Sequence, residues 1–468
     1  MSSSAITVPS PAIRYAGWLI ASVVFLAFYW RGLECWFFQD DWGWLHIALD
    51  PRYKSDVLAM LFAPKAHGNI RPWSENLFFF GLFRLFGVNA APFRMVAFAT
   101  VLADLYLLNL LVLRLTNSAL AAFGAQIFWI SNAAIAQSFC WTCIYNETQY
   151  LFFVLLALLL FIKGRYGWQV AIFILGLGSL ETAVMYPCLV SLYALLYDRR
   201  RLRLTLPLYL ISATYTLIHF WAAPAAKSGP YALQIDARIF STLARYIELA
   251  LGPERLGHFE YTWPAWSIAI ATGLLCAGIL ACIAAAPKTG LLGAGWFVIL
   301  LAPVLALPTH IADYLLTGPA MGLAIILGAA LASRWRAVGA LTAALYVLAS
   351  APAAWKSTGW NYERSLISRA LVDGVVEYDR AHPGKQLLLT GMDTDQFFAG
   401  FADQPFEDYR MHNVHLAPGA DQAIEDGGHR ALLFLLPLPE VHDLLASGQA
   451  VILDVSGGRV REAHLLGR

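Results

Sequence analysis

Near its start the chain reads RYAGWLIASVVFLAFYWRG over residues 14–32. A mostly apolar run of about 20 residues is long enough to cross the hydrocarbon of a bilayer as one helix. The residues that follow, GLECW at 32–36, offer no small-residue cleavage site, so they do not indicate a removable signal peptide. We therefore predict that this run is the first of several permanent membrane spans.

The composition of the whole chain agrees with this prediction. Hydrophobic residues make up 59% of the 468 residues and charged residues only 13%, whereas soluble domains carry about 25% charge. The net charge of +1 leaves no concentrated basic face of the kind that neutralises nucleic-acid phosphates. We expect the lipid bilayer, and no nucleic acid, as a partner.

Further apolar runs predict a polytopic α-helical membrane protein with about 11 transmembrane helices. The predicted spans lie near residues 14–32, 93–113, 118–138, 148–162, 167–180, 181–197, 204–222, 264–286, 291–308, 314–332 and 336–353. The fifth and sixth spans are short, and only the segment from Gly178 to Glu181 separates them.

The short loops after the even-numbered spans are all basic. They contain Arg114, Lys163 and Arg165, the run Arg199 to Arg201, Lys288, and Arg334 with Arg336. Because short cytoplasmic loops carry an excess of Lys and Arg, this pattern predicts a cytoplasmic N-terminus. The first loop, residues 34–92, and the C-terminal tail then lie on the outer face together with most of the acidic residues.

The sequence divides into two predicted domains. Residues 1–353 form a transmembrane domain, in which a helix on the membrane surface is expected at 75–86 within the first outer loop. Residues 354–468 form a small soluble α/β domain on the outer face, beginning with a helical stretch through Tyr378. Short apolar runs at 386–390, 431–436 and 450–455 predict strands in this domain.

Two adjacent carboxylates, Asp40 and Asp41, follow the first span within the segment Phe37 to Trp44. Carboxylates so close to lipid are costly unless they have partners or a wet cavity, so this pair indicates a site. The alternative is that one of them caps a short helix that begins near Trp42. The sequence favours neither interpretation over the other.

Arg71 precedes a proline in the same loop, shortly after His67. A guanidinium suits bidentate binding of phosphate. A contact with a lipid headgroup, or an internal ion pair with one of the aspartates, is the simpler structural alternative.

Other polar residues are predicted at the outer face. Glu147 begins the fourth span, and Glu181 lies at the break between the fifth and sixth, where a helix start alone could explain it. His310 and Tyr314 lie at the turn before the tenth span as possible pocket residues, and the small residues from Thr317 to Gly322 favour close helix packing.

Cys140 and Cys143 form an isolated CxxC motif, for which we favour a structural over a redox role.

These motifs, in their order and on their common side of the membrane, resemble those of the GT-C class of membrane glycosyltransferases. This class includes protein O-mannosyltransferases and the lipid A aminoarabinose transferase. The residues that carry the resemblance are Asp40-Asp41, Arg71-Pro72, Glu147, the segment Glu181 to Pro187, and Asp313 to Pro319, in which Asp313 stands where bacterial members have an arginine.

The resemblance implies a GT-C-like fold in a bacterial inner membrane, with a periplasmic C-terminus. It implies that the protein transfers a hexose or pentose, with inversion, from a polyprenyl-phosphate-linked donor to a glycan, lipid or protein acceptor. Asp40 would be the catalytic carboxylate and Asp41 its neighbour, Arg71 with His67 would bind the donor phosphate, and Glu147 or Glu181 would be a second acidic group near the acceptor.

No cofactor is indicated. Metal dependence varies within the class, and no His cluster in this sequence indicates a dedicated metal site.

Two other functions remain open. A polymerase or ligase of lipid-linked polysaccharides would use the same donor chemistry. A transporter or flippase of lipid-linked sugars would also need polar residues in a membrane cavity. Transporters, however, tend to place such residues near the bilayer midplane and to contain internal repeats, whereas this chain keeps them at one face. We expect a transferase.

Overall fold

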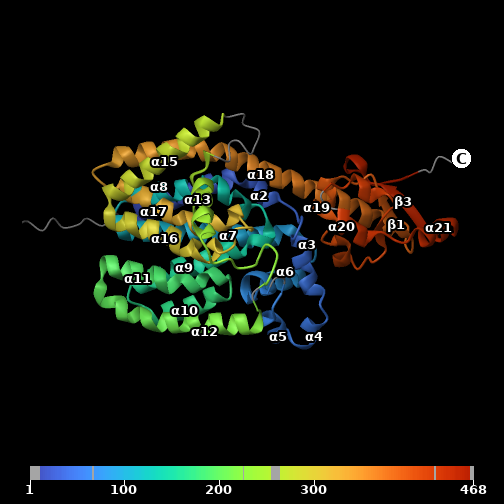
Figure 1. The fold of residues 1–468 in the computed structure, drawn as a ribbon, viewed down its shortest axis with the longest axis horizontal. Helices are drawn as coiled ribbons and strands as arrows, with labels where there is room; N and C mark the ends of the chain where they lie inside the picture. The colour runs from blue at the N-terminus through green and yellow to red at the C-terminus, as the bar shows by residue number, and fades with distance from the viewer. Residues whose placement is uncertain (1–10, 66–67, 225, 254–263, 426–427, 464–468) are drawn as a thin grey trace, which may run out of the picture.

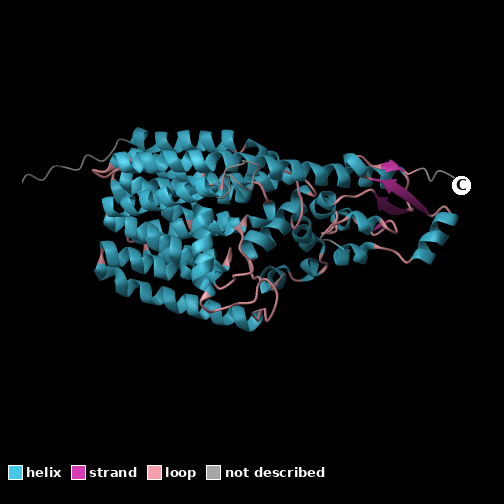
Figure 2. Cartoon of the chain, turned by 45° about the horizontal axis from the view of Figure 1, so that its top comes forward, coloured by secondary structure: helices cyan, strands magenta, loops and turns pink. Residues whose placement is uncertain are grey.

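The computed structural model describes residues 11–65, 68–224, 226–253, 264–425 and 428–463. Figure 1 shows a bundle of helices that fills most of the molecule, with a smaller domain at one end. Figure 2 shows that the strands lie only in this smaller domain, which contains the C-terminal residues.

The bundle and the loop segments around it contain the following helices. They are α1 (Pro11–Phe28), α2 (Trp30–Glu34), α3 (Asp41–Leu45), α4 (Arg52–Ser55), α5 (Val57–Phe62), α6 (Phe78–Phe86), α7 (Ala90–Thr116), α8 (Ala119–Ile130), α9 (Asn146–Ile162), α10 (Tyr166–Leu177), α11 (Tyr186–Tyr197), α12 (Leu206–Ala222), α13 (Arg238–Leu251), α15 (Ala265–Ala285), α16 (Pro287–Leu305), α17 (Ala320–Leu331) and α18 (Arg336–Ala381). Shorter helical turns include η3 (Pro72–Leu77), η4 (Ala133–Phe139), η5 (Thr142–Ile144), η6 (Glu181–Met185) and η8 (Asp313–Leu316).

Several helices are apolar enough for a membrane. Among the described residues, five are long enough to span one, and there are six if α8 and η4, which meet at a bend of 78°, count as one broken span. Each of the eleven predicted spans contains helix, but several of these helices are short. The chain is therefore built of apolar helices as a membrane protein is, and the count of about 11 spans stays a prediction.

Small residues let the central helices approach closely. A Cβ atom added at Gly293 on α16 would collide with the backbone oxygen of Gly322 on α17, and the reverse collision also occurs. Helices in membranes associate largely through such backbone contacts, because lipid tails are as apolar as leucine side chains. The prediction that the small residues up to Gly322 serve helix packing is confirmed.

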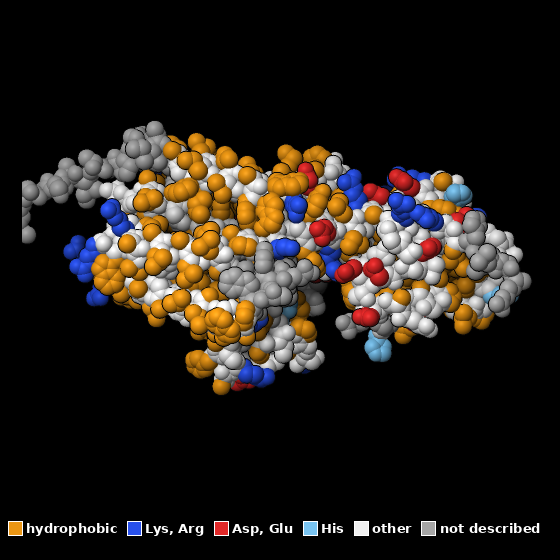
Figure 3. All heavy atoms as spheres, turned by 90° about the horizontal axis from the view of Figure 1, so that it is seen from above, with side chains coloured by type: hydrophobic (Ala, Val, Ile, Leu, Met, Phe, Trp, Pro, Cys, Tyr) orange, Lys and Arg blue, Asp and Glu red, His pale blue; other side chains and the backbone are white. Residues whose placement is uncertain are grey.

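The basic turns gather at one end of the bundle. Arg201 donates to the carbonyl oxygens of Phe161 and Ile162 at 3.1 and 3.2 Å, which brings the 199–201 turn to the end of α9. Figure 3 shows Lys and Arg side chains at the end of the bundle far from the C-terminal domain. Glu147 lies in the first turn of α9, so a helix of about 25 Å separates it from these basic turns.

The C-terminal domain is an α/β unit, as predicted. Its four-stranded sheet has the order β2-β1-β3-β4, and β1 pairs in parallel with both β2 and β3, while β4 runs antiparallel to β3. The strands are β1 (Gln386–Thr390), β2 (Val414–Leu416), β3 (Ala450–Asp454) and β4 (Arg461–Glu462), and the helices beside them include α19 (Thr394–Gly400), α20 (Gly428–Ala431) and α21 (Leu438–Ala446).

The structure differs from two predictions for this domain. The strand expected at 431–436 is wrong, because Leu432–Phe434 form a helical turn and only Leu435 makes an isolated bridge, to Leu416. Leu433 is 80% exposed, and Pro437 offers no N–H to continue a ladder. The boundary predicted at 353/354 falls inside α18, which runs without a break from the bundle into the C-terminal domain (Figure 1).

The C-terminal domain packs against the first outer loop. Gln39 N donates to the Ala399 carbonyl at 2.8 Å, and the Trp42 indole donates to the Ser368 hydroxyl at 3.2 Å. Phe37 and Trp42 share one apolar core with residues of the C-terminal domain such as Phe397. The segment that carries Asp40 and Asp41 is therefore held from outside the bundle.

The helix expected at 75–86 is present as η3 and α6.

Candidate functional site

A cavity of about 680 Å³ lies at the end of the bundle opposite the basic turns, beside the C-terminal domain. We call it the site cavity. Its lining includes six of the residues singled out from the sequence, namely Asp40, Arg71, Glu147, Glu181, His310 and Tyr314. Asp41 does not line it, and His67 lies outside the described residues. Residues far apart in the chain thus meet in one place.

The turn before α3 brings Asp40 to the cavity. Gln39 has a φ of +52°, a left-handed conformation that is uncommon for a residue other than glycine. Asp40 occupies the N-cap position of α3, but its side chain makes no capping hydrogen bond. It is exposed and lines the cavity wall. The capping role that the sequence also allowed is therefore absent at Asp40.

Asp41 has a different environment. Its side chain is fully buried and accepts hydrogen bonds from the backbone N–H of Phe38 at 3.2 Å and of Cys143 at 2.7 Å. Burial raises the pKa of Asp41, against the opposing effect of these two bonds and of Arg94. Asp41, predicted as the neighbour of the catalytic carboxylate, is closed off from the cavity, so its carboxylate positions the turn.

Arg71 is held by two carboxylates. Its guanidinium donates to Glu75 at 2.5 Å and to Glu181 at 2.8 Å. Burial lowers the pKa of Arg71, but Glu181 and Glu75 outweigh it and raise the pKa overall. The internal ion pair that the sequence allowed is therefore present, with two glutamates in place of an aspartate. The predicted phosphate contact would have to compete with both.

Gly178 explains how Arg71 reaches Glu181, 110 residues further along the chain. Trp73 N donates to the Gly178 carbonyl at 3.1 Å. A Cβ atom at Gly178 would collide with the Trp73 indole. Glycine at this break between two predicted spans thus lets the first outer loop close onto the bundle.

Glu75 and Glu147 complete an acidic cluster around Arg71. Asn146 donates to Glu75 at 3.0 Å, and burial raises the pKa of Glu75 against the opposing charge of Arg71. Glu147 is 2% exposed and interacts electrostatically with Arg71 and Glu181. Three carboxyl groups share one guanidinium, so this wall of the cavity favours protons or a cationic or hydroxyl-bearing ligand.

Another part of the cavity lining is aromatic. The His310 ring lies 4.5 Å from the Tyr231 ring, measured between centroids, and its Nε2 lies 3.4 Å from the Tyr314 hydroxyl. Trp141 stands edge-on to Tyr314 at 6.4 Å. Such flat, partly polar surfaces suit the stacking of sugar rings or lipid segments.

The sequence analysis missed several cavity residues. Lys65 lines the cavity, and among the described residues it forms no ion pair; its ammonium group lies 5.2 Å from the Tyr53 ring centroid. Burial lowers the pKa of Lys65. At the rim the C-terminal domain contributes Arg430 and Asp403, which pair at 2.5 Å. Isolated charges in ordinary loop sequence gave no signal.

One further residue, a buried arginine in α7, could have been recognised from the sequence. Arg94 lies within the predicted span 93–113, is fully buried, and donates to the carbonyl oxygens of Gly32, at 2.8 Å, and Phe139. A charge inside an apolar run marks a structural or functional contact by default. Here it ties the end of the first span to η4 behind the site.

Cys140 and Cys143 belong to no cluster of metal-ligating side chains among the described residues. In the part of the chain that the structure describes, no three His, Cys, Asp or Glu side chains converge as a metal site requires. Cys140 and Cys143 are buried free thiols, and the Cys140 thiol interacts with that of Cys35. The structural role favoured for this motif stays a prediction.

Comparison with models of known families, with characterised proteins and with solved structures finds no match to this chain. The function proposed below therefore rests on the residues and geometry described here.

Proposed function

We propose that this protein is a membrane-embedded, GT-C-like glycosyltransferase that moves a sugar, with inversion, from a polyprenyl-phosphate-linked donor to an acceptor hydroxyl. One observation carries the proposal: an exposed carboxylate, Asp40, lines a cavity together with Lys65, which forms no ion pair among the described residues, at the head of an apolar bundle. A general base and a cation that can hold a phosphate are the two groups that this transfer requires.

Asp40 is proposed as the general base. As the acceptor oxygen attacks the anomeric carbon, its proton passes to the Asp40 carboxylate. The bond between that carbon and the donor phosphate oxygen breaks as the new glycosidic bond forms, and one displacement inverts the anomeric centre. General-base catalysis of this kind contributes about 10²–10⁴-fold to a rate.

Lys65 is proposed as the direct contact of the departing phosphate. The resemblance implied Arg71, with His67, for this role, but the two carboxylates that hold Arg71 offset its charge. A lysine ammonium binds phosphate as a point charge, and Lys65 has no competing ion pair among the described residues. Arg71 then positions Glu181 and Glu75.

The acidic cluster suits the acceptor side. Glu147 and Glu181 line the cavity near Arg71 and can orient hydroxyl groups of an acceptor glycan or lipid. Apolar lining residues such as Phe220 and Leu307 offer a path for the isoprenoid between helices. In the orientation that the basic turns predict, the cavity opens on the periplasmic face of a bacterial inner membrane.

The test begins with the lipids that co-purify with the protein. Mass spectrometry should identify a polyprenyl phosphate sugar, and incubation of that donor with the protein and membrane extract should release free polyprenyl phosphate. A product of opposite anomeric configuration, assigned by NMR, is expected. Retention of intact donor, together with its movement across a vesicle membrane, would favour the transporter. Growth of a polymer would favour the polymerase or ligase.

A further inference from the structure

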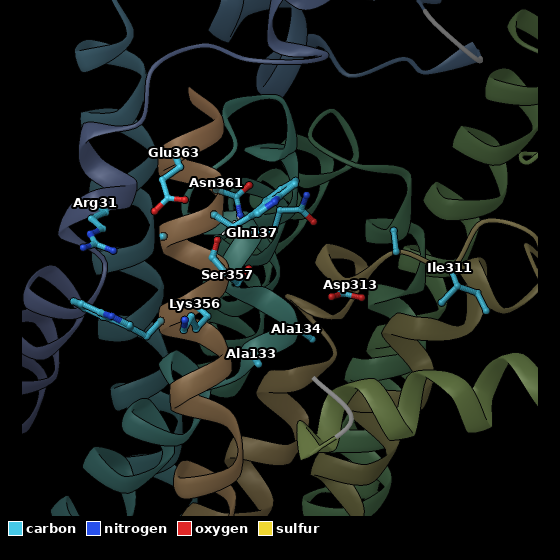
Figure 4. Close-up of a pocket in the computed structure, with 14 residues that line it drawn as sticks. Arg31, Ala133, Ala134, Gln137, Ile311, Asp313, Lys356, Ser357, Asn361 and Glu363 are labelled. Atoms are coloured by element: carbon cyan, nitrogen blue, oxygen red, sulfur yellow. Dashed lines mark hydrogen bonds between the residues drawn. The ribbon is translucent and has the colours of Figure 1, made fainter. Parts of the chain in front are cut away.

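A second cavity, of about 730 Å³, lies beside α18 and is separate from the site cavity. We call it the α18 cavity. Figure 4 shows Lys356, Ser357, Asn361 and Glu363 reaching into it from α18, with Arg31 on one side and Asp313 across the gap. Asp313 and Tyr314 are neighbours in sequence, yet Asp313 lines this cavity and Tyr314 lines the other. Neither the proposed transfer nor its residues use this space.

The α18 cavity is lined by charges of both signs. Among the residues that the structure describes, none of Arg31, Lys356 and Glu363 forms an ion pair with a side chain. The Arg31 guanidinium lies instead between two indole rings, 5.5 Å from that of Trp30 and 5.3 Å from that of Trp355. With Asp313, the lining holds two cations and two carboxylates, which fit a ligand that carries both charges.

A buried acceptor in the same cavity also lacks a partner. Asn361 is only 1% exposed; its Nδ2 donates to the Ser357 carbonyl at 2.8 Å, while its Oδ1 accepts no hydrogen bond. Buried polar atoms are nearly always hydrogen-bonded, because leaving one unpaired is costly. An N–H donor from a ligand that reached this atom would satisfy Asn361 Oδ1, whereas Glu363, two residues further along, projects from the other side of α18.

The position of the cavity along α18 indicates where such a ligand comes from. The apolar part of α18 that we predicted as a span ends at residue 353, directly before the cavity residues. Trp30, Trp355 and Trp360 are 42, 39 and 45% exposed around it. Exposed tryptophans at the end of an apolar helix are typical of the level of the lipid headgroups.

We infer that the α18 cavity binds the headgroup of a zwitterionic phospholipid with a primary ammonium, that is, phosphoethanolamine chemistry. Arg31 and Lys356 would bind the phosphate, and the Glu363 carboxylate would accept hydrogen bonds from the ammonium. The acyl chains would leave past the tryptophans along the bundle. This inference does not depend on the proposed transfer.

The experiment uses the full-length protein in micelles with equal amounts of phosphatidylethanolamine and phosphatidylglycerol, and native mass spectrometry to count the lipids that remain bound. Wild type should retain phosphatidylethanolamine preferentially. The double variant Arg31→Gln and Lys356→Gln should lose at least about tenfold in retention of both lipids, because charge-assisted hydrogen bonds to the phosphate are removed. Glu363→Gln should still retain lipid but should no longer prefer phosphatidylethanolamine over phosphatidylglycerol.

Arg369→Gln serves as the matched control, because Arg369 is an exposed cation on the same helix that pairs with Asp373 at 3.3 Å and does not line this cavity. It should retain lipid like wild type. Equal retention of both lipids by wild type, or an Arg369→Gln variant as weak as the double variant, would overturn the inference. Millimolar O-phosphoethanolamine should not displace the lipid; complete displacement would assign the site to a soluble ligand instead.

Discussion

The site cavity and the α18 cavity lie on two sides of the segment from His310 to Tyr314, and they handle charge in opposite ways. In the site cavity, Arg71 is paired with Glu75 and Glu181 inside the protein, and Arg430 with Asp403. In the α18 cavity, Arg31, Lys356 and Glu363 have no ion-pair partner among the described residues.

The two cavities therefore use charged side chains in two different ways. Paired charges form a fixed framework that holds its shape before a substrate arrives, as catalysis requires. Charged side chains without an ion-pair partner can instead pair with an oppositely charged group of a ligand, as a binding site requires. In the site cavity, Asp40 is exposed and Lys65 forms no ion pair among the described residues, which is why we assign the chemistry to these two residues and not to Arg71.

The largest expected effect is on catalysis. Asp40→Asn should slow sugar transfer about 10²–10⁴-fold, because the amide cannot accept the acceptor proton. The initial rate of polyprenyl phosphate release measures this effect. The retention of lipid in the α18 cavity should not change.

Asp236→Asn is the matched control for that variant. Asp236 is an exposed aspartate that pairs with Arg238 at 2.5 Å and does not line the site cavity. Its transfer rate should stay near that of wild type. Full activity of Asp40→Asn would remove Asp40 from the mechanism.

The second effect is on stability. Arg71→Gln should lower the free energy of unfolding by about 3–5 kcal/mol, because it leaves Glu75 and Glu181 without their shared partner in a buried place. The midpoint of thermal unfolding in detergent measures it. Adding Glu75→Gln to this variant should recover part of the loss.

An unchanged unfolding midpoint for Arg71→Gln, together with a weaker interaction with the donor, would mean that Arg71 is a phosphate ligand after all. In that case the two cavities would not differ in the way described.

A smaller effect is expected on donor binding. Lys65→Gln should raise the KM for the donor about tenfold with a lesser change in kcat, because one charge-assisted hydrogen bond to the phosphate is lost. Steady-state kinetics with purified donor measures both constants. Lys288→Gln, a lysine at the start of α16 away from the site cavity, should behave as wild type; equal KM values for both variants would exclude Lys65.

The smallest effect concerns the contact that holds the Asp40 turn from outside. Asp408 of the C-terminal domain lies 3.5 Å from His46, and neither of its carboxylate oxygens accepts a hydrogen bond. Burial raises the pKa of Asp408, with a further contribution from Glu407, and burial lowers that of His46. Both shifts favour the neutral forms.

The stability that neutral Asp408 contributes is therefore fully present below its unfolded pKa of about 3.9 and is lost as the pH rises through the raised folded pKa. Asp408→Asn should become more stable than wild type as the pH rises through that range. Unfolding midpoints of both proteins measured across pH test this expectation; parallel curves would contradict it.

The sequence predicted the helical part of the fold well, because the length of a membrane-crossing run is set by composition. The strands β1 and β3 were also predictable. The structure of the run 431–436 was not predictable, because a short apolar segment does not show whether another strand lies close enough to pair with it.

The candidate site was predictable only in part. Asp40 was visible because a carboxylate beside an apolar run is unusual. The ion pair between Arg71 and Glu181 could not be predicted, because the two residues are 110 positions apart in the sequence. The α18 cavity combines Arg31, Gln137, residues 311–313 and α18, and such a combination exists only after folding.

The most direct measurement is a cryo-EM structure of the Asp40→Asn variant with its lipid-linked donor bound. We predict density for the donor phosphate in the site cavity, within hydrogen-bond distance of Lys65, with the sugar facing position 40. Donor density in the α18 cavity, with no density in the site cavity, would contradict our assignment of catalysis to the site cavity and of lipid binding to the α18 cavity.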